Sequence, residues 1–343
     1  MNGPALADVG YDVDRIRKDF PILSSTVYGK PLVYLDNAAS AQKPQVVIDA
    51  ITDAYAKEYS NVHRGMHYLS NIATERFEQA RETAREFLNA ESSDEIVFTS
   101  GATDAINLVA SSFAEPRIEP GDEIILSILE HHSNIVPWHF LRERHGAVLK
   151  FVPVTNTGDL DVEAYRKLFT SRTKMVALTQ MSNALGTITP IREMIKIAHE
   201  RDVPVLVDGC QGVVHMPTDV RDMDCDFLVC SGHKLYGPTG IGLLYAKSEH
   251  LKAMRPYRGG GEMIREVSPD KVTYAAPPHR FEAGTPAIVQ AIGLGAALSY
   301  IQSVGRDRIA AHETVLRDYA TRRLSEINSL RIIGTTKNKG SIV

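Results

Sequence analysis

Short hydrophobic runs alternate with amphipathic segments along most of this chain. Seven largely apolar runs of strand length lie at residues 95–99, 123–129, 148–154, 174–180, 203–208, 226–232 and 240–246. Apolar residues with helical spacing occupy segments between many of these runs, at residues 74–90, 104–114, 161–169 and 190–201. Pro190 is well placed to start the last of these helices. Strands that alternate with helices predict an α/β fold, with a mainly parallel seven-stranded sheet flanked by helices on both faces.

The composition is that of an ordinary soluble globular protein. Of 343 residues, 43% are hydrophobic and 23% are charged. This length suits one large domain with a smaller one, or two domains of moderate size. The formal net charge of -4 disfavours a nucleic-acid or anionic-membrane partner. Because no apolar run is long enough to cross a bilayer and the N-terminus has no apolar signal segment, we expect a cytoplasmic location.

The three cysteines, Cys210, Cys225 and Cys230, show no CxxC spacing. An odd number without that spacing argues against both a disulfide framework and a zinc knuckle. Each cysteine lies in or next to an apolar run. We therefore expect all three to be small buried hydrophobic residues.

One strand end carries residues suited to binding an anion, and another carries a carboxylate suited to a cationic partner. In FTSGATDAINL the chain passes through Gly101 into a helix expected to begin near Thr103, which would offer free N–H groups to an anion. Neither the GxxxxGK[ST] nor the GxGxxG pattern is present, and a simple capped helix is the alternative. In VPVLVDGCQG, Asp208 ends a buried strand and needs a cationic partner, unless it caps the next helix.

Two further segments add titratable groups. LEHHSNIVPW brings the adjacent residues His131 and His132, which would point to opposite sides of a strand and lack zinc-site spacing. CSGHKLYGPTGIG places Lys234 between an apolar strand and a glycine-rich loop, as expected for a nucleophilic lysine. An anion cup, a buried aspartate, an imidazole and such a lysine together match the requirements of pyridoxal phosphate.

The motifs YLDNAAS, NVHRGMHYLS, FTSGATDAINLVA, EHHSNIVPW, VLVDGCQG, SGHKLYGPTGIGLLY and RFEAGTP occur in this order. Together they resemble the class V aminotransferase group, specifically the SufS-like (group II) cysteine desulfurases, from YLDNAAS to the end of the chain. The resemblance implies the fold type I architecture, pyridoxal 5'-phosphate and a homodimer. It also implies conversion of L-cysteine to L-alanine, action on selenocysteine, and sulfur transfer as a persulfide to a SufE- or SufU-like acceptor for iron–sulfur cluster assembly.

The resemblance also implies a role for individual residues. Lys234 would form the Schiff base and move the α proton of the substrate, while Asp208 would hold the pyridine nitrogen protonated. His131 would stack on the ring and Gln211 would bond its phenolic oxygen. The phosphate would be bound by Ala102, Thr103, Ser231 and His233, and by Thr285 of the neighbouring subunit. Asn183 would contact the cofactor or the substrate carboxylate, His63 and Arg64 would line the substrate entrance, and residues 258–264 would lie at the dimer boundary.

One departure from the family concerns its catalytic cysteine on a loop near the C-terminus, and an arginine close to it. Neither is present, and LRIIGTTKNKGSIV is expected to form the first strands of a small sheet. We predict an N-terminal segment of the small domain at 1–30, a large cofactor domain at 31–300 and a truncated small domain at 301–343. Such a chain, truncated or the ordered part of a longer product, would bind the cofactor without full turnover.

Two other functions remain open from the sequence. A transaminase or a kynureninase-like hydrolase of the same group would use the same lysine and aspartate without needing a cysteine. A non-catalytic truncated scaffold would keep the fold but would have little reason to retain Lys234, Asp208, Gln211, His131 and His233 together. EHHSNIVPW and RGGGEMI favour the desulfurase.

Overall fold

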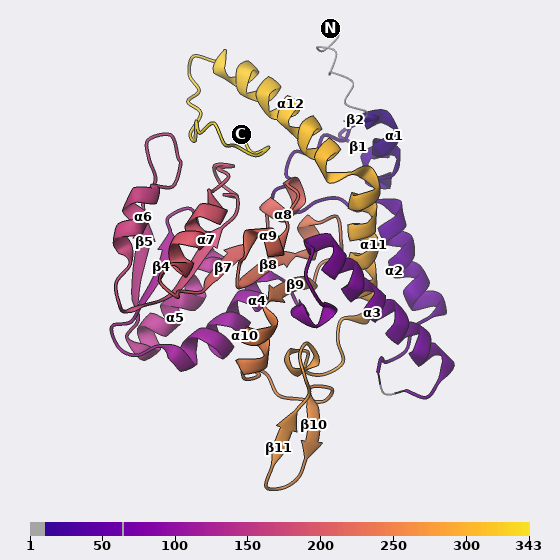
Figure 1. The fold of residues 1–343 in the computed structure, drawn as a ribbon. Helices are drawn as coiled ribbons and strands as arrows, with labels where there is room; N and C mark the ends of the chain where they lie inside the picture. Colours follow the sequence, from indigo (N-terminus) through magenta and orange to yellow (C-terminus); the bar gives the residue numbers. More distant parts are fainter. Residues whose placement is uncertain (1–10, 64) are drawn as a thin grey trace.

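A seven-stranded sheet forms the centre of the molecule in this computed structural model, which describes residues 11–63 and 65–343 (Figure 1). Its strands run in the order β3-β9-β8-β7-β6-β4-β5. Their bounds are β3 Ile96–Thr99, β4 Glu123–Ser127, β5 Val148–Val152, β6 Thr173–Thr179, β7 Val205–Asp208, β8 Phe227–Ser231 and β9 Gly242–Ala246. β9 is antiparallel to both of its neighbours, and the other neighbouring pairs are parallel. The prediction of a mainly parallel sheet from seven apolar runs is confirmed.

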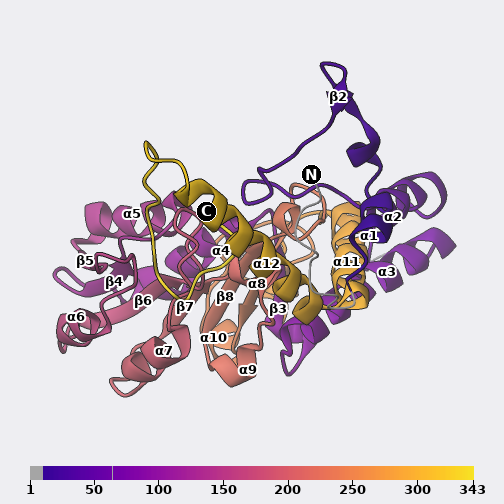
Figure 2. The ribbon, with the colours of Figure 1, turned by 90° about the horizontal axis from the view of Figure 1, so that it is seen from above.

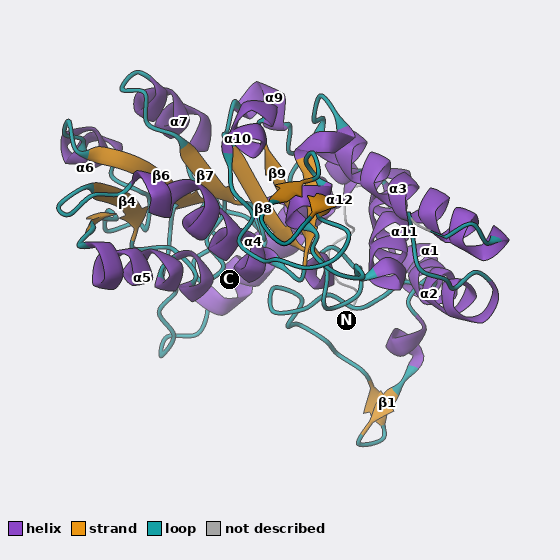
Figure 3. Ribbon diagram, turned by 90° about the horizontal axis from the view of Figure 1, so that it is seen from below, coloured by secondary structure: helices purple, strands orange, loops and turns teal. Residues whose placement is uncertain are grey.

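Helices cover both faces of this sheet (Figure 3). They are α1 Val13–Lys18, α2 Gln45–Lys57, α3 Tyr68–Leu88, α4 Ala102–Val109, α5 Val136–His145, α6 Val162–Leu168, α7 Ile191–His199, α8 Gly212–His215, α9 Val220–Met223, α10 Ser248–Ala253, α11 Ile288–Val304 and α12 Arg306–Ser325. All four predicted helices are present. α3 begins earlier than predicted because the His67 ring accepts the Leu69 N–H at 3.2 Å and caps the helix.

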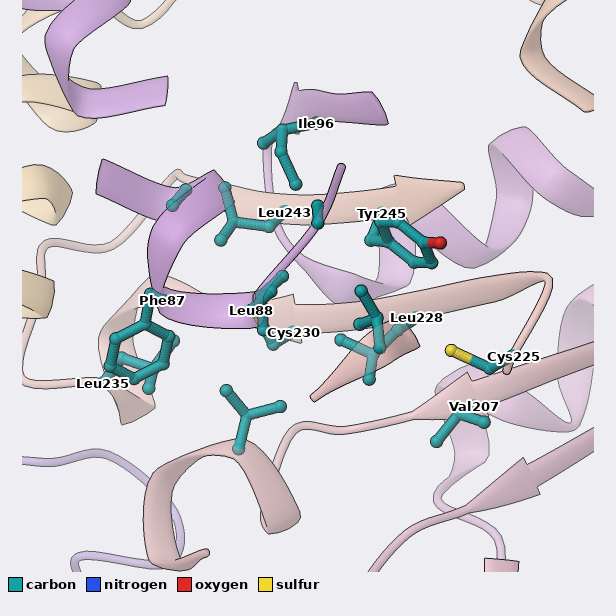
Figure 4. Packing of buried hydrophobic residues seen from close by; sticks show 14 of the residues in the cluster. Phe87, Leu88, Ile96, Val207, Cys225, Leu228, Cys230, Leu235, Leu243 and Tyr245 are labelled. Atoms are coloured by element: carbon teal, nitrogen blue, oxygen red, sulfur yellow. The ribbon is translucent and has the colours of Figure 1, made fainter. Parts of the chain in front are cut away.

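The core has two halves, one on each face of the sheet. Successive residues of β8 alternate between them, with Leu228 and Cys230 packed toward α3, α9 and α11, and Val229 packed toward α4 and α10. Figure 4 shows Cys225 and Cys230 among apolar side chains, which confirms the prediction for these two cysteines. The prediction is wrong for Cys210, which is partly exposed because it follows the end of β7 at a cavity.

Two short hairpins project from the body of the molecule. β1 (Thr26–Val27) pairs with β2 (Lys30–Pro31), and this hairpin stands clear of the rest of the chain in Figure 2. β10 (Ile264–Val267) pairs with β11 (Val272–Tyr274) at the lower edge of Figure 1. Both hairpins leave their strand residues largely exposed in a single copy of the chain.

The strands predicted near the C-terminus do not form among the described residues. The segment after α12 instead lies along the turn at Gly186, where the Ile188 N–H donates to Asn338 O and the Gly340 N–H donates to Gly186 O, each at 2.8 Å. The prediction of a small sheet fails because this turn already supplies partners for the backbone groups of the segment.

No single helix in the described part of the chain is long and apolar enough to cross a membrane. Among the described helices, only α11 and α12 taken together are long and apolar enough, and the chain bends by 74° between these two helices.

Candidate active site

A cavity of about 470 Å³ lies at the carboxyl ends of the parallel strands. Nine of the residues expected at the site line it: Ala102, Thr103, His131, Asn183, Asp208, Gln211, Ser231, His233 and Lys234. These residues follow five different strands, and they meet because the carboxyl ends of parallel strands share one edge of the sheet.

The start of α4 forms one wall of the cavity. Its N-terminus has no side-chain cap, and the Ala102 N–H donates to Ser231 Oγ at 3.0 Å. Gly101 and Gly242 come so close that a Cβ on Gly242 would lie 2.6 Å from the Gly101 Cα. Glycine at 242 therefore lets the helix start lie directly beside β9. This arrangement presents backbone N–H groups and a helix dipole to an anion.

A buried carboxylate lies at the end of β7. Asp208 is 3% exposed, and its Oδ1 accepts the Cys210 N–H at 3.0 Å. Across residues 11–63 and 65–343, no cation forms an ion pair with it. A buried carboxylate is costly without a positive partner, so this group fits a ligand that brings a protonated nitrogen.

Lys234 lies on a short 3₁₀ helix, Gly232–Lys234, directly after β8. A Cβ on Gly232 would lie 2.8 Å from Ile241 Cγ2 and 3.0 Å from Ile241 O, so this turn requires glycine. The segment 36–43 covers the turn, since the Ala41 N–H and Lys43 Nζ both donate to His233 O at 3.1 Å. Burial, with Lys234 and Lys43 nearby, lowers the pKa of His233, which favours its neutral form.

His131 follows β4 in a turn and does not lie on a strand, so the expectation that the strand pleat sets its direction is wrong. Its Nδ1 accepts the Ser133 N–H at 3.1 Å, which leaves Nε2 to carry the proton of the neutral ring. Burial, and then the charge of Lys234, lowers the pKa of His131. A neutral imidazole at this position suits stacking on an aromatic cofactor.

Glu130 holds the turn that carries His131. It accepts the Thr179 N–H at 3.0 Å and the Asn134 amide at 2.7 Å, and it bonds the Ser127 hydroxyl. The Asn134 amide oxygen in turn accepts Trp138 Nε1 at 3.1 Å. Glu130 therefore ties the end of β4 to the end of β6, which fixes His131 relative to the rest of the cavity edge.

Three expected residues lie elsewhere. His63 lines a second cavity of about 250 Å³, next to which Thr285 is exposed beside Pro286. Neither is among the described residues that line the main cavity. Arg64 lies outside the described residues.

Several residues line the main cavity without having been expected from the sequence: Asp36, Ala38, Ala39, Ser133, Thr179, Met181 and Cys210. Thr179 and Cys210 could have been found, because each ends or follows an apolar strand as Asp208 does. Asp36 belongs to the YLDNAAS motif and reaches the cavity because Gln211 Nε2 donates to Ala38 O at 2.8 Å. That contact joins segments far apart in the sequence, so no local sequence pattern could have predicted it.

The fold and cavity together define a pyridoxal-phosphate protein of fold type I. The family described as Aminotransferase class-V matches residues 33–343, and the chain belongs to that family. The cofactor of the site is pyridoxal 5'-phosphate. The cavity fits it, with an amine at Lys234, a buried carboxylate at Asp208 and an uncapped helix start at Ala102.

Individual relatives narrow the comparison. The chain is 51% identical over 335 residues to a protein of Synechococcus elongatus described as cysteine desulfurase, covering 98% of this chain but 54% of that protein. It is 51% identical over 333 residues to the cysteine desulfurase of Dickeya dadantii, covering 97% of this chain and 81% of that protein. The crystal structure of the cysteine desulfurase CsdA from Escherichia coli has a TM-score of 0.83 and 42% identity, and the match covers 92% of this chain and 77% of that one. The chain thus spans about half the length of the Synechococcus relative.

Proposed function

We propose that this chain provides the catalytic site of a pyridoxal-phosphate-dependent cysteine desulfurase of the SufS-like group. One observation carries the proposal: Lys234, Asp208 and His131 line a single cavity, in a chain 51% identical to cysteine desulfurases. When bound, pyridoxal phosphate supplies an electron-withdrawing ring that stabilises negative charge on the substrate.

Each cavity residue has a proposed task. Lys234 holds the cofactor covalently and moves the α proton of the substrate, since it is the only lysine that lines the cavity among the described residues. Asp208 would keep the ring nitrogen protonated, and His131 would stack on the ring and relay protons near the substrate thiol. Gln211 would bond the phenolic oxygen, and Asn183 would contact the cofactor or the substrate carboxylate. The phosphate would be bound by Ala102, Thr103, Ser231 and His233. Thr285 of a second copy, and His63 and Arg64 at the substrate entrance, complete the site.

The reaction balances with a thiol as the only co-reactant. L-cysteine and an accepting thiol give L-alanine and a persulfide: the C–S bond of the substrate breaks, an S–S bond forms, and a proton ends on carbon. The cysteines of this chain are poorly placed to accept the sulfur. Cys225 and Cys230 are 0% and 1% exposed, and burial, followed by Asp208, raises the pKa of the Cys210 thiol well above its usual value. We propose that full turnover needs a thiol other than these three.

The partners follow from the same proposal. L-cysteine is the substrate, with selenocysteine as a further one, and the working unit is a cytoplasmic homodimer. A SufE- or SufU-like protein takes the sulfur for iron–sulfur cluster assembly. The names of the relatives support the substrate, and the exposed position of Thr285 in a single copy supports the dimer.

The test begins with the cofactor. The purified chain is incubated with pyridoxal phosphate, treated with borohydride and digested, beside Lys234→Ala and the control Lys174→Ala, whose side chain is exposed on β6. We expect the cofactor on the peptide that contains Lys234, unchanged in the control and lost in Lys234→Ala. Cofactor on any other lysine would contradict the assignment.

Product analysis then separates the candidate reactions. With L-cysteine and excess dithiothreitol as the accepting thiol, we expect alanine and sulfide, and little product without the added thiol. A keto acid in place of alanine would favour a transaminase. A persulfide found on Cys210, Cys225 or Cys230 by mass spectrometry would overturn the proposal that the accepting thiol lies elsewhere.

A further inference from the structure

Three side chains of the kinds that bind metal ions, two histidines and a glutamate, meet at the second cavity. None of them lines the main cavity. His63 lies before α3, Glu78 lies within α3, and His279 lies on the 3₁₀ helix His279–Phe281. His63 Nε2 is 2.8 Å from Glu78 Oε1, and one ligand atom from each of the three residues lies within 4.8 Å of the other two. His63 and His279 also line the cavity of about 250 Å³, which gives a path to the cluster.

The carboxylate of this cluster is held in place from behind. Arg81 Nε donates to Glu78 Oε2 at 2.8 Å, while Arg81 Nη2 donates to Glu282 Oε2 at 2.9 Å. Arg81 is 1% exposed and also bonds Ile96 O at 2.9 Å, so it cannot move freely. Two carboxylates thus share one guanidinium. The two carboxylates carry one negative charge more than the single guanidinium balances, which favours a cation.

The two imidazoles are also arranged for a ligand. His63 has a φ of 67°, a left-handed conformation that is costly for a residue other than glycine, and its N–H is held by Thr74 Oγ1 at 2.8 Å. His279 is half-buried, lies 5.0 Å from the His63 ring between centroids, and has no hydrogen-bond partner for its ring in the part of the chain that the structure describes. A ring nitrogen without a hydrogen-bond partner is free to bind a metal ion.

We propose that His63, Glu78 and His279 bind a divalent transition metal of the zinc type. Two imidazoles and one carboxylate are a ligand set that zinc accepts, and three protein ligands leave a fourth position for water. Two imidazole ligands disfavour magnesium and calcium, which prefer oxygen donors. Arg81 orients the Glu78 carboxylate through its hydrogen bond, as residues that bond to metal-ligating side chains do in known metal sites. His63 is also placed at the substrate entrance in the proposed function, so the test measures metal binding and not turnover.

The test titrates the cofactor-loaded protein, freed of metal with a chelator, with Zn²⁺ by calorimetry and with Co²⁺ by visible spectroscopy. We expect one equivalent to bind, with cobalt bands of the intensity typical of four-coordination. His279→Gln should weaken binding at least ~10-fold, because it removes a ligand and not merely an outer partner. His139→Gln is the matched control, since it removes one half-buried imidazole of α5 away from the cluster.

Other outcomes would overturn the proposal. Equal affinity in wild type and His279→Gln, or no binding in the wild type, would remove the site. A near-ultraviolet thiolate-to-cobalt band would place the metal at a cysteine. Glu78→Gln provides a second ligand variant, and thermal unfolding in chelator separates loss of a ligand from loss of the fold.

Discussion

Glu130 is a buried carboxyl, and its surroundings shift its pKa in opposite directions. Burial raises its pKa, while the bonds from Ser127, Asn134 and the Thr179 N–H lower it. Burial dominates, and the pKa of Glu130 is raised to about 8. The sequence drew attention to the neighbouring histidines and gave no sign of this residue, because its partners come from β4, from the 3₁₀ turn His132–Asn134 and from β6. The loop that carries His131 therefore depends on a group that changes charge in the neutral range.

The stability of the protein should carry the signature of that group. An unfolded glutamate loses its proton near ~4.3, whereas Glu130 in the folded state keeps it up to about 8. Its contribution to stability is therefore fully present at low pH and is lost as the pH rises through about 8, with a slope of at most about 1.4 kcal/mol per pH unit. Guanidinium unfolding of wild type and Glu130→Gln between pH 5 and 8 measures this. Wild type should lose stability relative to Glu130→Gln as the pH rises, and parallel curves would refute the prediction.

At the level of elements, the close approach of β9 to the start of α4 shapes the anion wall. No side chain separates Gly242 from Gly101. The three atoms nearest to a Cβ on Gly242 would be backbone atoms, Gly101 Cα at 2.6 Å and Cys230 O at 2.7 Å among them. Backbone atoms cannot rotate away as a long side chain can, so even one added methyl group must push the strand and the helix apart.

Gly242→Ala should therefore lower both stability and cofactor retention. We expect a loss of about 1–3 kcal/mol in the free energy of unfolding, typical of overpacking. Pyridoxal phosphate should also dissociate more easily, because the N–H groups of α4 move. The control for stability is Gly259→Ala, where an added Cβ meets nothing within 4 Å. Denaturant unfolding and the cofactor content after dialysis measure the two effects, and an equal loss of stability in the two variants would show that the contact is unimportant.

The elements and part of the site could be predicted because their causes are local. Apolar runs define the strands, and the parallel arrangement then brings residues such as Thr103, Asp208 and Lys234 to one edge. The C-terminal strands were wrongly predicted because a strand needs a partner, and the Gly186 turn takes that place. Cys210 was wrongly assigned to the core because its exposure depends on a cavity formed by distant segments.

At the scale of the whole molecule, a single copy of the chain leaves the candidate site divided. Lys234 lines the main cavity, whereas His63 lines the second cavity and Thr285 is exposed beside Pro286, another residue of that second cavity. Thr285 is exposed on a segment next to the β10–β11 hairpin, whose strands are also largely exposed. A second copy would cover this side and bring Thr285 to the phosphate of its neighbour, if the proposed dimer forms.

Mixing variants tests whether Thr285 acts across subunits. Lys234→Ala removes the covalent attachment of the cofactor, and Thr285→Val removes the proposed phosphate contact while keeping a similar volume. In a mixed dimer, the subunit with intact Lys234 receives Thr285 from its partner, so one of the two sites is complete. We expect co-expressed, differently tagged variants to regain wild-type cofactor affinity at that one site, measured by visible absorbance during dialysis. If Thr285 acts within its own subunit, no complete site can form, and retention should stay at the level of the Thr285→Val homodimer. If Thr285 does not contact phosphate at all, that homodimer should already retain the cofactor as the wild type does.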